Sequence, residues 1–230
     1  MKHIVVLTGA GMSAESGIST FRDSGGLWEQ HKIEDVATPE GFDRNPQLVL
    51  DFYNERRKAA FEAKPNAGHI GLAEMEKEYI VSIVTQNVDD LHERAGSTSV
   101  LHLHGELSKV RSTANPDLIY TLTPDKPEIN IGDKAEDGSQ LRPHIVWFGE
   151  AVPMLESAIA IVRQADILVV IGTSLNVYPA AGLLNYVHTG VPIYLIDPNL
   201  VNASRSDIHF IRKGASEGVA ILRSQLSAFD

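Results

Sequence analysis

Four short stretches of the chain are almost entirely apolar, rich in Val and Ile, and end abruptly in small polar residues. They cover residues 4–7, 80–84, 167–171 and 193–196. Unbroken rather than alternating apolar character is typical of strands covered on both faces, as in a parallel sheet. Residues 67–77 and 154–164 have helical apolar spacing, so the order of elements predicts βαβ units and an α/β fold.

Two segments interrupt this alternation. Residues 26–62 have a helical pattern with a break at Thr38-Pro39, and residues 112–141 are rich in Pro, Asp, Gly and Thr with only scattered apolar positions. We expect the two segments to form a smaller lobe beside the parallel sheet.

Small polar residues follow each of the four expected strands. These clusters are Thr8-Gly9, Thr85-Gln86-Asn87, Gly172-Thr173-Ser174 and Asp197-Pro198-Asn199. In open α/β sheets, ligands bind beyond the carboxyl ends of the strands. We therefore expect all four clusters to face one crevice.

Composition and charge narrow the class of protein. At 230 residues, with 43% hydrophobic and 22% charged residues, the chain is typical of a globular domain. The net charge of −10 disfavours a nucleic-acid partner, because affinity for nucleic acid comes mostly from Lys and Arg. The chain has no cysteine, which excludes disulfides, thiolate metal sites and thiol nucleophiles. Residues 4–7 are too short a run for a signal peptide or membrane span, so we expect a cytoplasmic protein, compatible with a monomer.

The first strand runs into Gly9-Ala10-Gly11-Met12-Ser13-Ala14, a G-x-G-x-x-A variant of the dinucleotide fingerprint. Glycines let the backbone approach a pyrophosphate, whose charge is met by amides at the next helix N-terminus. The alternative is a tight turn built from small residues. A hydride-transferring dehydrogenase is disfavoured, because residues 17–28 have the character of a loop and bring no acidic residue to the end of a second strand.

Several motifs, taken in order, resemble those of sirtuins. They are Gly9-Ala10-Gly11-Met12-Ser13, Glu15-Ser16-Gly17-Ile18, Thr20-Phe21-Arg22, Thr85-Gln86-Asn87-Val88-Asp89-Asp90-Leu91-His92, His104-Gly105-Glu106 and Gly172-Thr173-Ser174. The resemblance implies one catalytic domain over residues 1–230. Its Rossmann-like parallel-sheet lobe would hold residues 1–25, 79–107 and 143–230, and its smaller lobe would be made of two insertions, residues 26–78 and 108–142.

The activity implied by the resemblance is that of an NAD-dependent protein deacylase, which consumes NAD and an acylated lysine side chain and releases nicotinamide and O-acyl-ADP-ribose. By similarity, His104 and Asn87 are catalytic, Gln86 and Asp89 help to hold the ribose and nicotinamide, and Phe21 and Arg22 belong to a loop that closes over NAD. The expected NAD-binding residues are Gly9, Ala10, Gly11, Ser13, Ser16, Gly17, Phe21, Arg22, Trp28, Gln86, Asn87, Asp89, Gly172, Thr173, Ser174, Asn199 and Ala215.

His104 is expected to act as the general base that takes a proton from a ribose hydroxyl. An imidazole suits this role because its ordinary pKa, about 6.5, lies near neutrality. Outside this motif, a histidine beside a strand would more often be structural. His102 would share a strand face with His104, but no third ligand stands at a metal-site spacing, so we expect no metal.

Tyr53 and Arg56 stand three positions apart on a predicted helix and would be neighbours on one face. An Arg fork beside a phenol can receive a small carboxylate through charge-assisted hydrogen bonds. Together with Ala37, the pair resembles the sirtuin branch that accepts succinyl- and malonyl-lysine as well as acetyl-lysine. The alternative is that Arg56 is a surface charge balanced by Glu55 or Asp51.

Residues 143–150 have extended character and resemble the peptide-binding strand of sirtuins. Val146, Trp147, Phe148 and Gly149 are the expected substrate contacts, through main-chain pairing with the bound segment. The alternative is an interior strand whose two aromatic residues pack in the core.

The chain departs from the family in the region of residues 108–141, where sirtuins usually carry four cysteines that bind zinc. Without them, we expect the smaller lobe either to be held by apolar contacts such as those of Ile119, Leu122, Ile129 and Ile131, or to be partly mobile. Two other functions stay open: mono-ADP-ribosyl transfer to a protein side chain, and a non-catalytic sensor of NAD or ADP-ribose.

Overall fold

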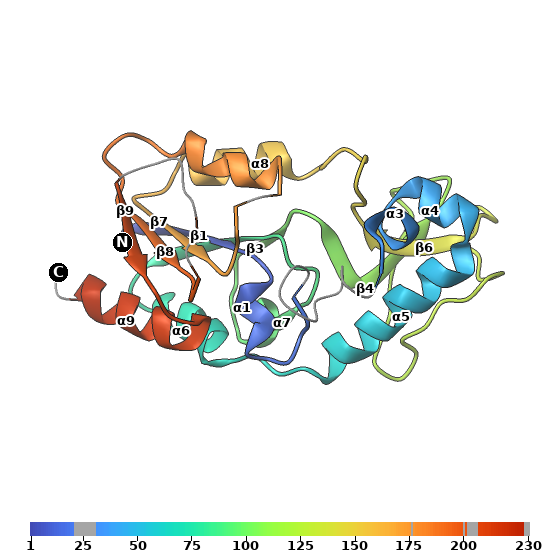
Figure 1. The fold of residues 1–230 in the computed structure, drawn as a ribbon, viewed down its shortest axis with the longest axis horizontal. Helices are drawn as coiled ribbons and strands as arrows, with labels where there is room; N and C mark the ends of the chain where they lie inside the picture. Colours follow the sequence, from blue (N-terminus) through green and yellow to red (C-terminus); the bar gives the residue numbers. More distant parts are fainter. Residues whose placement is uncertain (21–30, 176, 200, 202–206, 228–230) are drawn as a thin grey trace.

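A computed structural model describes residues 1–20, 31–175, 177–199, 201 and 207–227 of the chain. Its larger part is a six-stranded sheet in the order β3-β2-β1-β7-β8-β9, with every neighbouring pair parallel (Figure 1). The strands are β1 (His3–Thr8), β2 (Ile80–Thr85), β3 (Val100–His102), β7 (Ile167–Ile171), β8 (Ile193–Ile196) and β9 (Ile208–Ile211). The prediction of an α/β fold with a parallel sheet is confirmed.

The sheet is covered on both faces, which is why its central strands are apolar throughout. Helices α6 (Ala67–Met75) and α9 (Ala215–Ser227) lie on one side, and α8 (Leu155–Val162) with the 3-10 segment η1 (Ala180–Tyr186) lies on the other (Figure 1). Successive residues of β1 alternate between the two cores: Ile4 and Val6 belong to one, Val5 and Leu7 to the other. All four are at most 4% exposed.

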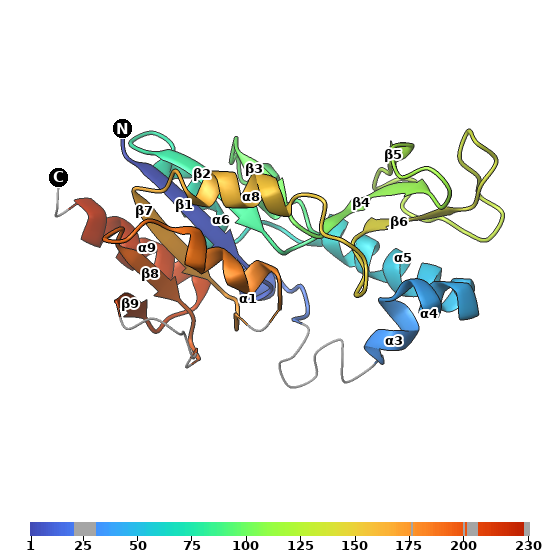
Figure 2. The same cartoon turned by 90° about the horizontal axis from the view of Figure 1, so that it is seen from above.

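The smaller part contains a three-stranded antiparallel sheet in the order β5-β4-β6, which lies beyond one end of the large sheet (Figure 2). Its strands are β4 (Gly105–Ser112), β5 (Ile119–Thr121) and β6 (Leu141–Ile145). Helices α3 (Ile33–Val36), α4 (Pro39–Arg44) and α5 (Pro46–Glu62) share a hydrophobic core with it. The break predicted at Thr38-Pro39 is the start of α4, where the Thr38 hydroxyl accepts a hydrogen bond from the amide of Gly41.

Helix α6 and strand β6 lie near the expected boundaries between the two lobes, and each packs against a different sheet. Helix α6, within residues 26–78, contributes Leu72 and Met75 to the core of the large sheet and lies against α9. Strand β6 spans residue 143 and pairs with β4 in the small sheet. The exact lobe bounds therefore stay a prediction.

A hydrogen-bonded clamp at Arg57 and Asn54 joins α5 to β4 and to the segment between β5 and β6. The buried Arg57 guanidinium donates to the backbone oxygens of Leu107 and Pro127 and, over 2.7 Å, to Oδ1 of Asn54. Asn54 in turn pairs with both the backbone oxygen (2.9 Å) and the amide (3.1 Å) of Ile129.

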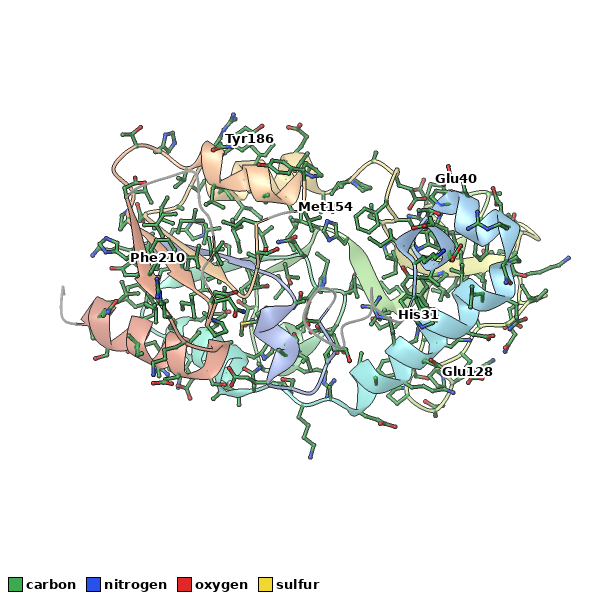
Figure 3. All side chains as sticks on the ribbon, in the orientation of Figure 1. His31, Glu40, Glu128, Met154, Tyr186 and Phe210 are labelled. Atoms are coloured by element: carbon green, nitrogen blue, oxygen red, sulfur yellow. The ribbon has the colours of Figure 1, made fainter. Side chains whose placement is uncertain are left out.

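The expectation that four apolar residues hold the small part is wrong for two of them. Ile129 is 2% exposed and belongs to the core, and Leu122 packs against that core. Ile119 and Ile131, however, are 43% and 51% exposed. The polar clamp supplies cross-links that periodicity could not reveal. Outside it, Glu128 lies on the surface beside α5 and pairs with Lys58 (Figure 3).

No helix in the described parts of the chain is both long and apolar enough to cross a membrane.

Candidate active site

The turn after β1 fits directly against the turn after β7. The amide of Gly11 donates to the backbone oxygen of Gly172 over 2.9 Å, and a Cβ added at Gly9 or Gly11 would lie 2.7 Å from atoms of Gly172 or Thr173. Gly172 has a φ of +62°, and a Cβ there would lie 2.3 Å from the amide nitrogen of Met12. These glycines are therefore required, first of all, by the close approach of two backbone turns.

The N-terminal amides of the helix that follows the turn already donate to backbone oxygens of the protein. Helix α1 (Gly11–Ala14) is four residues long, and the amides of Gly11, Met12 and Ser13 donate to Gly172, Gly9 and Ala10 respectively. All three amides thus have backbone acceptors within the protein, and their contact with a pyrophosphate stays a prediction.

Asn87 sits above a buried hydrogen-bond network. Its side-chain Nδ2 donates to Oγ of Ser13 over 3.2 Å. His69 accepts from the amide of Asn66 at Nδ1, so its Nε2 carries the hydrogen that points to Oγ of Ser13, 3.4 Å away. Ser13 also hydrogen-bonds to Asp89, whose pKa is raised by burial. The network fixes the Asn87 side chain at the carboxyl end of β2.

His104 is half-buried just beyond β3. It lies at the wall of a cavity that the glycine turns after β1 and β7 also line. Its Nδ1 lies 3.2 Å from the backbone oxygen of Gln86, which can only accept a hydrogen bond. The hydrogen of the neutral ring is thus on Nδ1, and Nε2 keeps its lone pair. Burial lowers the pKa of His104 below 6.5, against the opposing effect of the Gln86 oxygen. Both features suit a general base.

His102 has the opposite surroundings. Its Nδ1 lies 2.9 Å from the backbone oxygen of Asn87 and its Nε2 lies 2.8 Å from Oε1 of Glu93. Burial alone would lower the pKa of His102, but the hydrogen bond and charge of Glu93 raise it above 6.5. With both nitrogens donating, His102 has no lone pair for a metal, and no group of three or more His, Asp or Glu residues in the described part of the chain could hold one.

The residues expected to receive the acyl group line the same cavity as His104. The guanidinium carbon of Arg56 lies 5.7 Å from the centre of the Tyr53 ring, and Nε1 of Trp147 donates to the Tyr53 oxygen over 3.1 Å. Ala37 and Arg56 line the same space, and Arg56 is half-buried rather than a plain surface charge. The structure thus brings these four residues together.

The segment expected to pair with a substrate peptide is strand only as far as Ile145. The amides of Val146, Trp147 and Phe148 donate to the His104 oxygen, a Glu150 carboxylate oxygen and the Ala37 oxygen respectively. Main-chain pairing with a substrate segment therefore depends on acceptors of this stretch rather than on these amides. Trp147 is 2% exposed, which fits packing in the core. Phe148 is 42% exposed, which fits contact with a substrate.

One cavity of about 540 Å³ joins the two ends of the site. The expected site residues at its wall are Gly9, Ala10, Gly11, Gln86, Asn87, His104, Gly172, Thr173, Ser174, Asn199, Ala37, Tyr53, Arg56, Val146, Trp147, Phe148 and Gly149. The volume is in the range of sites for small organic ligands. The clusters after β1, β2, β7 and β8 therefore do face one crevice.

Five expected NAD-binding residues lie behind or beside this wall. Ser13 and Asp89 belong to the network under Asn87, and the Ser16 hydroxyl accepts from Nδ2 of Asn66. Gly17 is exposed with a φ of +84°, and Ala215 is buried at the start of α9, next to Gly214 at the cavity wall. Direct ligand contact by these five stays a prediction.

Phe21, Arg22 and Trp28, also expected to bind NAD, fall outside the described residues.

Other residues at the wall were not expected from the sequence. Tyr178 and Pro179 lie there beyond Ser174. The signal that could have found them is position alone, since each follows the carboxyl end of a parallel strand by a few residues.

A parallel α/β sheet whose glycine turns and strand-end amides open onto one cavity, with an imidazole at its wall, is typical of a nucleotide-binding enzyme. Residues 9–179 match the model of the Sir2 family. An NAD-dependent protein deacylase of Bacteroides thetaiotaomicron is 62% identical over 230 residues, which cover 98% of each chain. The chain belongs to the Sir2 family.

Solved structures agree with this assignment. A Sir2 homologue in complex with NAD superposes with a TM-score of 0.86 at 41% identity, covering 98% of this chain and 91% of that one. A Sir2 homologue variant in complex with 2′-O-acetyl ADP ribose gives a TM-score of 0.87 at 40% identity, covering 98% of this chain and 94% of that one.

Proposed function

We propose that this NAD-dependent protein deacylase of the Sir2 family removes succinyl and malonyl groups, as well as acetyl groups, from lysine side chains, and that it releases nicotinamide and O-acyl-ADP-ribose. The observation that carries the acidic-acyl part is that Arg56 and Tyr53 lie side by side and line the same cavity as the glycine turns. The 2′-O-acetyl ADP ribose held by a related Sir2 homologue supports the product assignment.

The cavity fits NAD in both size and lining. Its turns at Gly9, Gly11 and Gly172 bring backbone close to the ligand space, and Gln86 and Asn87 add side-chain amides where the ribose and nicotinamide are expected. Bound NAD would supply the ADP-ribosyl group to which the acyl group is transferred. The protein's part is to hold the two substrates in register and to keep water out of the junction.

We assign the proton transfer to His104. Its Nδ1 hydrogen is held by the Gln86 oxygen, so Nε2 is the atom that takes the ribose hydroxyl proton once the acyl oxygen has attacked. Asn87, anchored through Nδ2 to Ser13, positions the sugar at the junction. His102, fixed between Glu93 and the Asn87 oxygen, holds the main chain that carries this asparagine.

At the acyl end, a succinyl or malonyl carboxylate would meet a cation and a phenol in a low-dielectric pocket. Charge-assisted hydrogen bonds are stronger there than in water, and an Arg fork can bind both carboxylate oxygens. Ala37, 4% exposed, keeps the wall of this pocket short. Acetyl-lysine lacks the carboxylate and would use the same pocket without that contact.

The net charge of −10 disfavours nucleic acid as the partner.

The test compares peptides of one sequence that carry acetyl-, succinyl-, malonyl- or succinamyl-lysine, the last being a neutral analogue of succinyl. For Arg56→Met we expect kcat/KM on the succinyl peptide to fall by about ten- to a hundredfold, with little change on the acetyl and succinamyl peptides. Lys58→Met, an exposed cation two positions further along α5, is the matched control and should change neither. Equal losses on the acetyl and succinyl peptides would mean that Arg56 is structural.

A further inference from the structure

The hydrogen bond between Trp147 and Tyr53 has a direction that matters for the acyl pocket. An indole nitrogen can only donate, so the Tyr53 oxygen is the acceptor of the 3.1 Å contact. The phenol's own hydrogen must then be donated elsewhere. Within the described residues, no acceptor lies in hydrogen-bond geometry with it, although Tyr53 is only 2% exposed. Since Tyr53 lies at the cavity wall, the hydrogen is available to a ligand there.

Three contacts fix Trp147 in place: one to its backbone amide and two to its indole ring. The backbone amide of Trp147 donates to Oε2 of Glu150 over 2.8 Å. The guanidinium carbon of Arg142 lies 3.4 Å from the centre of the indole ring, a close cation–π contact. The Phe42 ring packs against the indole with its centre 5.3 Å away. The ring therefore has little freedom to turn its N–H away from Tyr53.

Arg142 and Glu150 form a two-point ion pair that completes this support. Nη1 and Nη2 of Arg142 lie 2.7 and 3.1 Å from the two carboxylate oxygens of Glu150, and Nη2 also donates to the backbone oxygen of Ile145. Arg142 is 8% exposed, so the pair is poorly screened by solvent. A cation on the ring face also makes the indole N–H a stronger donor.

We propose that Trp147 is a specificity-determining residue: by occupying an acceptor site of the Tyr53 oxygen, it directs the Tyr53 hydroxyl hydrogen to the carboxylate of an acidic acyl group beside Arg56. Arg142 and Glu150 are positioning residues that hold the indole in place. The inference rests on the proposed removal of succinyl and malonyl groups.

The experiment is a double-mutant cycle on acyl preference. The ratio of kcat/KM for a succinyl-lysine peptide to that for the matching acetyl-lysine peptide is measured for the wild type, Trp147→Phe, Tyr53→Phe and the double variant. Each single change should lower the ratio by about tenfold. The double variant should lower it no further than Tyr53→Phe alone, because the indole acts only through the phenol.

Two further variants separate positioning from packing. Phe42→Leu loosens the packing of the indole without removing its N–H, and should lower the melting temperature while keeping the ratio. Glu150→Gln keeps the Trp147 and Tyr53 side chains but removes the charge that anchors Arg142 and the Trp147 amide, so the indole can shift and the ratio should fall. It also answers the question if Trp147→Phe does not fold.

Four results would overturn the proposal: an unchanged ratio in Trp147→Phe, losses that multiply in the double variant, a ratio that falls equally in Phe42→Leu, or an unchanged ratio in a folded Glu150→Gln enzyme. If Tyr53→Phe lowers the ratio and Trp147→Phe does not, the proposed function stands and only the role of Trp147 fails. If the wild type has no activity on succinyl-lysine peptides, both the proposed removal of succinyl groups and the proposed role of Trp147 are wrong.

Discussion

The Nδ1 atom of His104 lies 3.2 Å from the backbone oxygen of Gln86, and this contact decides which nitrogen of the ring can act as a base. His102, two positions earlier, is instead held at both nitrogens and has a raised pKa. The pKa values of these two histidines, two positions apart, are therefore shifted in opposite directions: burial lowers that of His104, while the hydrogen bond and charge of Glu93 outweigh burial and raise that of His102.

The lowered pKa of His104 predicts the acidic side of the pH–rate profile. Only the neutral ring can accept a proton, and burial moves its pKa below 6.5, so the base form persists to lower pH than in an ordinary histidine. We expect the acidic limb of kcat/KM on an acetyl-lysine peptide to have its midpoint below 6.5. Steady-state rates, with folding checked by circular dichroism at each pH, provide the measurement. An apparent pKa above 6.5 would contradict the assignment.

Two buried histidines predict a loss of stability in acid. Burial lowers the pKa of His69 to about 4 and that of His92 well below 6.5. The unfolded chain binds protons on these rings that the folded protein does not, so their contribution to stability is present above pH 6.5 and is lost as pH falls toward the folded pKa.

For His69 alone this amounts to roughly 2 kcal/mol between about pH 6.5 and about pH 5. Urea unfolding at about pH 7.5 and about pH 5 measures the difference, and His69→Asn should show a smaller pH dependence than the wild type. Parallel slopes for the two proteins would show that His69 is not the group responsible.

The clamp of Asn54 and Arg57 should contribute measurably to folding. Asn54→Ala removes both hydrogen bonds to Ile129 and leaves part of the buried Arg57 guanidinium without its partner. We expect a loss of about 2–3 kcal/mol in the free energy of unfolding, measured by urea denaturation. Ile131→Ala, at a side chain that is 51% exposed, should cost under about 0.5 kcal/mol. Similar losses for both variants would mean that the small part is held by dispersed apolar contacts instead.

Apolar periodicity predicted the buried strands, but it could not predict which polar side chains are buried. The central strands were predictable because burial on both faces demands unbroken apolar runs, as at residues 4–7 and 167–171. The shared crevice followed from the rule for strand ends. Adjacent arginines, by contrast, look alike in sequence: Arg56 lines the cavity and Arg57 is a buried clamp, and only the surrounding backbone oxygens distinguish them.

The glycines of the first turn show a second limit of prediction from sequence. Their spacing predicted a close backbone approach, and the structure has one, but the partner is the turn at Gly172 and Thr173. Spacing reveals that a Cβ is not tolerated and does not reveal which atoms exclude it. The exposed Ile119 and Ile131 show the same limit for apolar residues in an irregular segment.

The proposed reaction is tested most directly by nicotinamide release from NAD labelled in its adenosine half, with an acetyl-lysine peptide, by the wild type and by His104→Ala. We predict that the wild type releases nicotinamide only when the acyl peptide is present and that the label leaves as O-acyl-ADP-ribose. We also predict that His104→Ala forms this product at least about a hundredfold more slowly while binding NAD with nearly unchanged affinity. Near-normal product formation by His104→Ala, or label that stays attached to protein, would contradict the proposed reaction.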